Sequence, residues 1–273
     1  MPKILKKVFS AVFGALLLFV TALRCVQLFC LTDISTGFIN RNAAGTIALF
    51  FALCFALMLI LGILLKKGAF KNPFHKSKSR LLFNISIAAG IAMFYDFVYK
   101  CVICCKYIAE ASSFRLNYFI PACLGVLSAL LCTIYFVMMG VSFKTDHYDF
   151  KSFKYYHIVP VLWILFSLFS SLSDYNDGIY AEEKMLYYLV LIFGMLFFAE
   201  LIRCIHSDYK KLKLLCFWGF AYAMLCFVLS VPRMIGFVFG AALTGVDFSV
   251  ITYLFMSVFA ASFSFSMIKL KEE

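Results

Sequence analysis

The sequence alternates between long apolar stretches and short polar segments that carry Gly, Pro, Asn, Asp or Lys. A helix that crosses a bilayer needs about 20 consecutive apolar residues. Apolar stretches of this length recur along all 273 residues, so the pattern predicts an all-α transmembrane bundle of eight helices in a single integral membrane domain, residues 1–273. The predicted spans are about 8–30, 45–65, 81–104, 118–142, 156–174, 184–205, 212–235 and 248–268.

The composition indicates that lipid, rather than water, surrounds most of the chain. Hydrophobic residues make up 64% and charged residues 14%, against about 45–50% and about 25% in soluble domains. The formal net charge of +11 would suggest nucleic acid in a hydrophilic protein. Here the basic residues lie in short loops between apolar stretches, so we expect no nucleic-acid partner.

The distribution of Lys and Arg predicts that both termini are cytoplasmic, because cytoplasmic loops carry an excess of these residues. Each segment assigned to the inside is more basic than the outer segments beside it. The inner segments contain Lys3, Lys6, Lys7, Lys66, Lys67, Lys71, Lys76, Lys78, Arg80, Lys144, Lys151, Lys154, Arg203, Lys210, Lys211, Lys213, Lys269 and Lys271. The outer segments contain Arg41, Lys106, Arg115, Lys184 and Arg233.

Two spans leave alternatives open. Lys6 and Lys7 precede the first apolar run, as in a signal peptide, but apolar residues continue past Arg24 to Leu31, which favours a retained helix. The seventh span is followed by Pro232, Arg233 and an apolar run over 236–246 that is too short to cross. This run is either a kinked extension of the helix or a half-helix that dips back from the outer face.

Charged residues inside the predicted spans are the first candidates for function, because each costs about 2.5–3.5 kcal/mol on insertion scales. Their positions predict that they gather in the outer half of the bundle. We predict a polar, outward-facing pocket for an anionic or zwitterionic small molecule, lined by Arg24, Gln27, Asp96, Tyr99, Lys100 and Arg233. The structural alternative is that Asp96 neutralises Lys100 or Arg24 while Arg233 extends to the lipid headgroups.

Helical spacing adds detail to two spans. One face of the third span carries Ala89, Ala92, Asp96 and Tyr99. Its small residues favour packing toward the inside of the bundle. Glu200 in the sixth span has Arg203 three residues on, so the alternatives there are a local ion pair or an ion-coupling carboxylate.

The third span ends in three thiols, Cys101, Cys104 and Cys105. One cluster without an outer His is a poor zinc site, so we expect no metal and either free thiols or one disulfide. The remaining Cys residues in the middle of apolar runs act as small hydrophobes.

The loop between the second and third spans is the most basic segment. It predicts contact with anionic lipid of the inner leaflet or, alternatively, docking of a protein partner. The residues concerned are Lys66, Lys67, Lys71, Lys76, Lys78 and Arg80.

The segment Thr32-Asp33-Ile34-Ser35-Thr36-Gly37-Phe38 follows the first span and suits a capped turn. Together with Arg24-x-x-Gln27 upstream, it resembles a pattern in uncharacterised multi-span membrane proteins of clostridia-like, low-GC Gram-positive bacteria. The resemblance is local, from Arg24 to Phe38, and implies no known activity.

Three functions are compatible with these features. The first is transport of a small molecule or ion across the cell membrane by a multi-pass protein. The second is a sensor or assembly subunit that docks a cytoplasmic partner or a second copy of the chain. The third is a membrane-embedded enzyme acting on lipid, although the sequence contains no HExxH, GxSxG or Walker motif. We expect no cofactor.

Overall fold

The computed structural model describes residues 3–32, 44–66, 79–110, 116–145, 155–173, 181–206, 212–239 and 249–268. Within these ranges, eight helices are long and apolar enough to cross a membrane. The predicted all-α class and the number of spans are therefore confirmed. The helices are α1 (Lys3–Val26), α2 (Ala44–Lys66), α3 (Arg80–Glu110), α4 (Leu116–Lys144), α5 (Val159–Ser173), α6 (Ala181–His206), α7 (Leu212–Val238) and α8 (Val250–Met267).

Four elements differ in detail from the predicted spans. A π-helical segment, η1 (Gln27–Leu31), continues α1, and a short 3-10 helix, η3 (Tyr156–Ile158), precedes α5. The third span is longer than predicted, since α3 runs to Glu110. α7 continues as one helix through Pro232 to Val238, so the first part of the apolar run 236–246 is a helical extension. Residues 240–248 lie outside the described residues.

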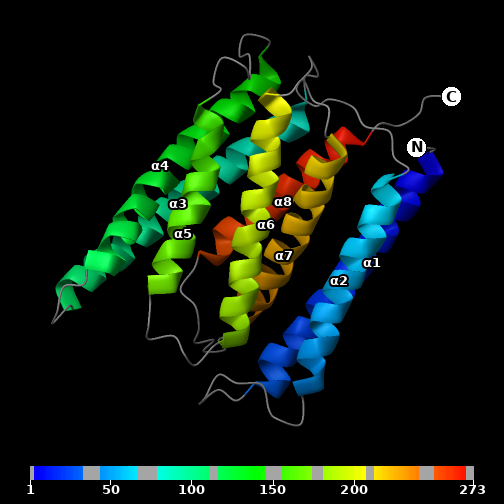
Figure 1. Ribbon diagram of the computed structural model, residues 1–273, viewed down its shortest axis with the longest axis horizontal. Helices are drawn as coiled ribbons and strands as arrows, with labels where there is room; N and C mark the ends of the chain where they lie inside the picture. The colour runs from blue at the N-terminus through cyan, green and yellow to red at the C-terminus, as the bar shows by residue number, and fades with distance from the viewer. Residues whose placement is uncertain are drawn as a thin grey trace.

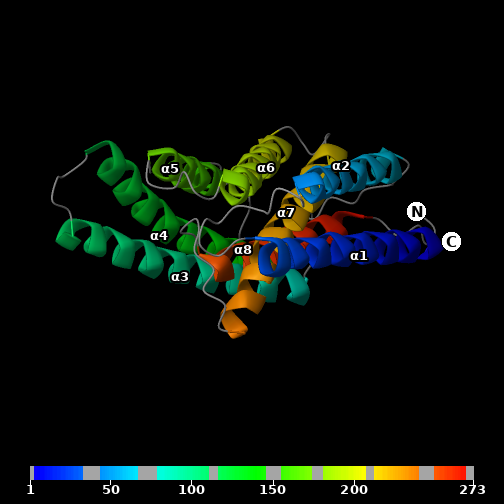
Figure 2. The same cartoon turned by 90° about the horizontal axis from the view of Figure 1, so that it is seen from below.

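The helices are arranged around α7 and α8 (Figures 1 and 2). An α1–α2 hairpin packs on α7, while α3, α4 and α5 lie on the other side of the bundle and α3 also contacts α8. In α7, 72% of the apolar spanning stretch is buried inside the bundle, against 22% in α2. α7 is therefore the central helix and α2 a peripheral one. α1 begins and α8 ends at the same end of the bundle (Figure 1).

Large apolar side chains cover the outside of the bundle as well as its inside. Leu18, Phe55, Ile63 and Ile91 are each more than half exposed. A protein surrounded by water rarely presents such a continuous apolar exterior. The chain is therefore an integral, multi-pass membrane protein.

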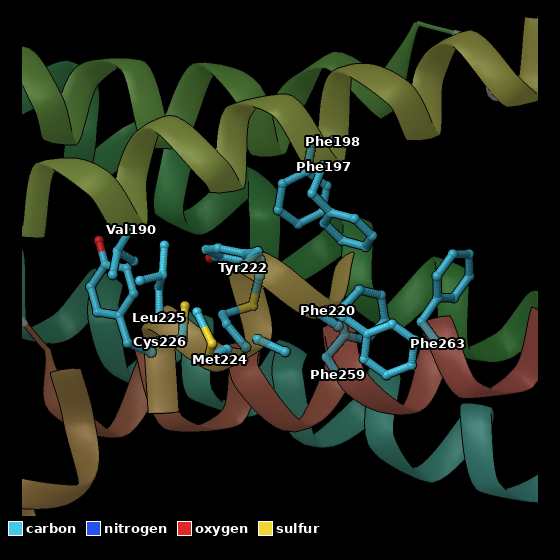
Figure 3. Packing of buried hydrophobic residues seen from close by; sticks show 14 of the residues in the cluster. Val190, Phe197, Phe198, Phe220, Tyr222, Met224, Leu225, Cys226, Phe259 and Phe263 are labelled. Carbon is cyan, nitrogen blue, oxygen red and sulfur yellow. The ribbon is translucent and has the colours of Figure 1, made fainter. Parts of the chain in front are cut away.

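Aromatic side chains from α6, α7 and α8 form a cluster within the buried core (Figure 3). The ring of Phe197 stacks against that of Tyr222 with their centroids 6.0 Å apart, and Phe259 stacks against Phe263 at 5.8 Å. All four side chains are fully buried. Aromatic pairs at such separations contribute about 0.5–1.5 kcal/mol beyond their buried area, so this cluster fixes how the three helices pack.

Small residues let the central helices approach closely, as is usual between membrane helices. A Cβ atom added to Gly219 of α7 would lie 2.1 Å from Ser264 Oγ of α8. Ser257 Oγ donates a hydrogen bond to the carbonyl of Ala223 at 2.7 Å. The face of α8 that carries Ser257 and Ser264 therefore packs against α7 within one chain.

The orientation of the bundle can be tested independently of its fold. We expect a cytoplasm-active reporter fused after Glu273 to be active and a periplasm- or exterior-active reporter at the same position to be silent, because the basic loops are expected to stay inside. Fusions within 174–180 should give the reverse result. Activity of the exterior reporter at the C-terminus would overturn the predicted orientation.

Replacing Gly219 with Ala should destabilise the protein by about 1–3 kcal/mol, the usual cost of overpacking, because the new methyl group would overlap Ser264 Oγ. Gly125→Ala in α4 is the matched control, since an added Cβ there meets nothing within 4 Å. Thermal unfolding in detergent measures both. A midpoint for Gly219→Ala at or above that of Gly125→Ala would contradict the packing described.

Candidate functional site

The carboxylate of Asp96 forms the centre of a polar network that joins α3 to α5. Lys100 Nζ and Trp163 Nε1 each lie 2.8 Å from the same oxygen, Asp96 Oδ2. Asp96 is 1% exposed and Trp163 is fully buried. A carboxylate in an apolar bundle needs both a countercharge and hydrogen-bond donors, and these two residues provide them.

Lys100 connects the same network to a second residue of α5. Its Nζ donates to Ser167 Oγ at 3.0 Å and lies 5.1 Å from the centre of the Trp163 ring. Ser167 Oγ in turn donates to the carbonyl of Trp163 at 2.8 Å. Asp96 and Lys100 are four residues apart on α3, and Trp163 and Ser167 are four apart on α5, so one turn of each helix faces the other.

Two tyrosines extend this region toward α6 and α8. The ring centroid of Trp163 lies 5.8 Å from that of Tyr253, and the hydroxyls of Tyr253 and Tyr187 are 3.2 Å apart. On the α8 side, Thr252 Oγ1 donates to the carbonyl of Ala92 at 2.9 Å. Four helices therefore meet at Asp96, Lys100, Trp163 and Ser167, which we call the Asp96 network.

The predicted inward face of α3 is confirmed for its small residues and its acid. Ala89, Ala92 and Asp96 are all buried. Tyr99 is half-buried, and its ring stacks against that of Tyr95 with the centroids 6.4 Å apart. Tyr99 thus lies at the edge of the face rather than at its centre.

Arg24 and Gln27 belong to a different network, between α1 and α2. Arg24 Nη1 donates to Gln27 Oε1 at 3.1 Å, and the Gln27 amide donates to the Thr46 carbonyl at 2.8 Å. The guanidinium also lies 5.7 Å from the centre of the Phe50 ring. Arg24 is 6% exposed and Gln27 is fully buried. The π-helical turn η1 begins at Gln27, and π-helical turns frequently occur at functional sites.

Arg233 forms a third network, between α6 and α7. Its Nε lies 2.6 Å from Glu183 Oε1, and both side chains are about nine-tenths buried. This ion pair joins the first turn of α6 to the last turns of α7. The sequence predicts either a pocket residue or contact with lipid headgroups for Arg233. It does not indicate Glu183 as the partner, because Glu183 lies one residue before the predicted sixth span.

Glu200 forms the local ion pair that its spacing predicts, with Arg203 Nη1 3.2 Å from Glu200 Oε1. The Arg203 side chain is 50% exposed. The other carboxylate oxygen, Glu200 Oε2, is buried and accepts no hydrogen bond from the residues that the structure describes. Arg80, at the start of α3, is exposed. The Lys66 side chain, the remaining basic residues of the loop 67–78 and the turn Asp33–Phe38 lie outside the described residues.

Five of the six residues predicted to line one pocket are thus divided among networks on different helices, while Tyr99 stacks on Tyr95 at the edge of the α3 face. Asp96 and Lys100 are together, Arg24 and Gln27 are together, and Arg233 pairs with Glu183. Sequence reasoning missed Trp163 and Ser167. A signal for Trp163 did exist, because an indole N–H in the middle of an apolar span requires an acceptor.

Neither a metal cluster nor a disulfide is found among the described residues. No group of three or more His, Cys, Asp or Glu side chains is arranged to hold an ion there, and the cysteines are free thiols.

Comparison of the chain with protein-family models, with curated proteins and with solved structures gave no match.

The buried ion pair Glu183–Arg233 should matter far more for stability than the exposed pair Glu200–Arg203. Removing one member of a buried pair costs about 3–5 kcal/mol, whereas an exposed pair contributes about 1 kcal/mol or less. We expect Glu183→Met to lower the thermal midpoint strongly and the double variant Glu183→Met/Arg233→Met to recover most of the loss. Arg203→Met is the control. Equal midpoints for Glu183→Met and Arg203→Met would contradict the burial of the pair.

Proposed function

We propose that this membrane protein transports a small zwitterionic or anionic solute across the cell membrane and that the Asp96 network is its binding site. The observation that carries the proposal is the ion pair Asp96–Lys100 inside the bundle, whose members also contact Trp163 and Ser167. Ionisable residues within membrane spans are costly to keep and mark solute pathways in many transporters.

The chemistry of the network matches a zwitterion, because the pair itself is arranged like one. A ligand carboxylate could replace Asp96 at Lys100 Nζ and Ser167 Oγ, which lie 3.0 Å apart. A ligand ammonium could replace Lys100 at Asp96 Oδ2 and above the Trp163 ring. Such an exchange leaves no buried charge without a counterpart, which limits its cost. An anion alone would make only the first half of the exchange and would leave Asp96 without its countercharge, so the network favours a zwitterion.

The different exposure of the two charges supports access from one side. Asp96 is 1% exposed, whereas the Lys100 side chain is 22% exposed. A ligand anion therefore meets the lysine before the acid. Tyr187 and Tyr253 provide hydroxyls and aromatic surface next to this position, as sites for small molecules commonly do.

The Glu183–Arg233 pair and the Arg24–Gln27 pair fit a supporting role in this proposal. Each joins two neighbouring helices, α6 to α7 and α1 to α2. They would hold the bundle around the Asp96 network rather than contact the solute. Glu200 stays a candidate for ion coupling, since its buried Oε2 accepts no hydrogen bond among the described residues.

Lys100→Ala should weaken solute binding by about 10- to 100-fold, because it removes charge-assisted hydrogen bonds worth about 1.5–3 kcal/mol. Purified protein is first screened by thermal shift against small amino acids, betaines and carboxylates. Counterflow of the solutes that stabilise it is then measured in proteoliposomes, with Lys100→Ala beside wild type.

Lys213→Ala is the control, because it removes an exposed basic residue at the start of α7 and changes the net charge by the same amount. It should keep both the thermal shift and counterflow. A screen in which nothing stabilises the wild type, or counterflow by folded Lys100→Ala at the wild-type rate, would overturn the proposal. Specific release of a lipid product by the purified protein would favour the enzyme alternative instead.

A further inference from the structure

Two thiols on neighbouring helices lie side by side at one end of the α3–α4 pair. Cys104 of α3 and Cys123 of α4 lie close enough for their thiols to interact. Both are partly exposed, unlike Cys54, Cys132 and Cys216, which are buried in the core. The sequence indicated a thiol cluster on α3 alone, and the structure adds a partner from the next helix.

The packing of α3 on α4 places these two residues opposite each other independently. Toward the other end of the pair, a Cβ on Gly90 would lie 3.0 Å from Val137 Cγ2. The steps from Gly90 to Cys104 and from Val137 back to Cys123 are both fourteen residues, about 3.9 helical turns. The antiparallel helices therefore present Cys104 and Cys123 on the faces that Gly90 and Val137 occupy.

The length of α3 brings Cys104 near the membrane surface. α3 has 31 residues, about 46 Å at 1.5 Å per residue, whereas the hydrocarbon core is about 30 Å thick. A helix of this length must tilt or project from the core. Cys104 lies in the last two turns of α3 and Cys123 in the first turns of α4, and both thiols are partly exposed.

We propose that Cys104 and Cys123 are a redox-active pair that forms a disulfide by exchange with a low-molecular-weight disulfide. One thiolate attacks the external disulfide, forms a mixed disulfide and releases one external thiol. The second cysteine then attacks the protein sulfur of the mixed disulfide and releases the other external thiol. The two cysteine thiols are oxidised to one disulfide, the external disulfide is reduced to two thiols, and their protons pass to these products.

The consequence is a covalent link between α3 and α4, near the end of α3 and the start of α4. Cys104 follows Lys100 by one helical turn, and Lys100 follows Asp96 by one turn. Oxidation would therefore fix the end of the helix that carries the candidate site, and reduction would release it. This proposal does not depend on the solute or on transport.

The experiment treats the reduced, purified full-length protein with glutathione disulfide and then alkylates the remaining thiols in denaturant. Mass spectrometry of the intact protein should show two fewer alkylated thiols than the eleven of the sequence. Peptide mapping should recover a cross-link between Cys104 and Cys123. Since the mapping uses the unaltered chain, the result does not depend on the folding of any variant.

Single substitutions then separate the attacking and resolving thiols. Cys123→Ser should stop at a glutathione adduct on Cys104, while the matched controls Cys101→Ser and Cys105→Ser should still form the cross-link. Three results would each overturn the proposal: eleven alkylated thiols after treatment, a glutathione adduct that persists in the unaltered chain, or a cross-link confined to α3 between Cys101 and Cys104 or Cys105.

Discussion

One carboxylate oxygen of Asp96 accepts hydrogen bonds from both Lys100 and Trp163, and the polar interior of the bundle is built around it. In lipid, neither the acid nor the lysine can find water, so each must be neutralised by the protein. The indole and Ser167 come from α5, and the aromatic surface beyond them comes from α6 and α8. A charge on α3 thereby constrains the positions of three other helices.

The remaining buried charges obey the same constraint, with partners chosen from neighbouring helices. Arg24 is held by Gln27 and by the face of the Phe50 ring, and Arg233 is held by Glu183. Each arrangement joins two helices that also adjoin each other in the bundle. Polar contacts therefore contribute to specific helix pairing, while the aromatic core of α6, α7 and α8 contributes the packing area.

Much of this architecture could be predicted from the sequence, because spans and their number depend on long apolar runs that lipid requires. The local pairs Asp96–Lys100 and Glu200–Arg203 could also be predicted, since helical spacing alone brings their members together. The partners of Gln27 and Arg233 could not be predicted in the same way. Glu183 and Thr46 are distant in sequence, and which helix lies beside which depends on side-chain packing that periodicity does not encode.

The division of labour between α3 and α7 follows from these contacts. α7 is the most buried span, and its close approach to α8 depends on Gly219, where a side chain would overlap Ser264. α3 instead carries the acid, the lysine and the Cys104 thiol at successive turns of one face. Because α3 contacts both α4 and α8, its buried polar side chains lie beside the apolar centre of the bundle. The charged pair and the apolar centre thus occupy adjacent helices of one bundle.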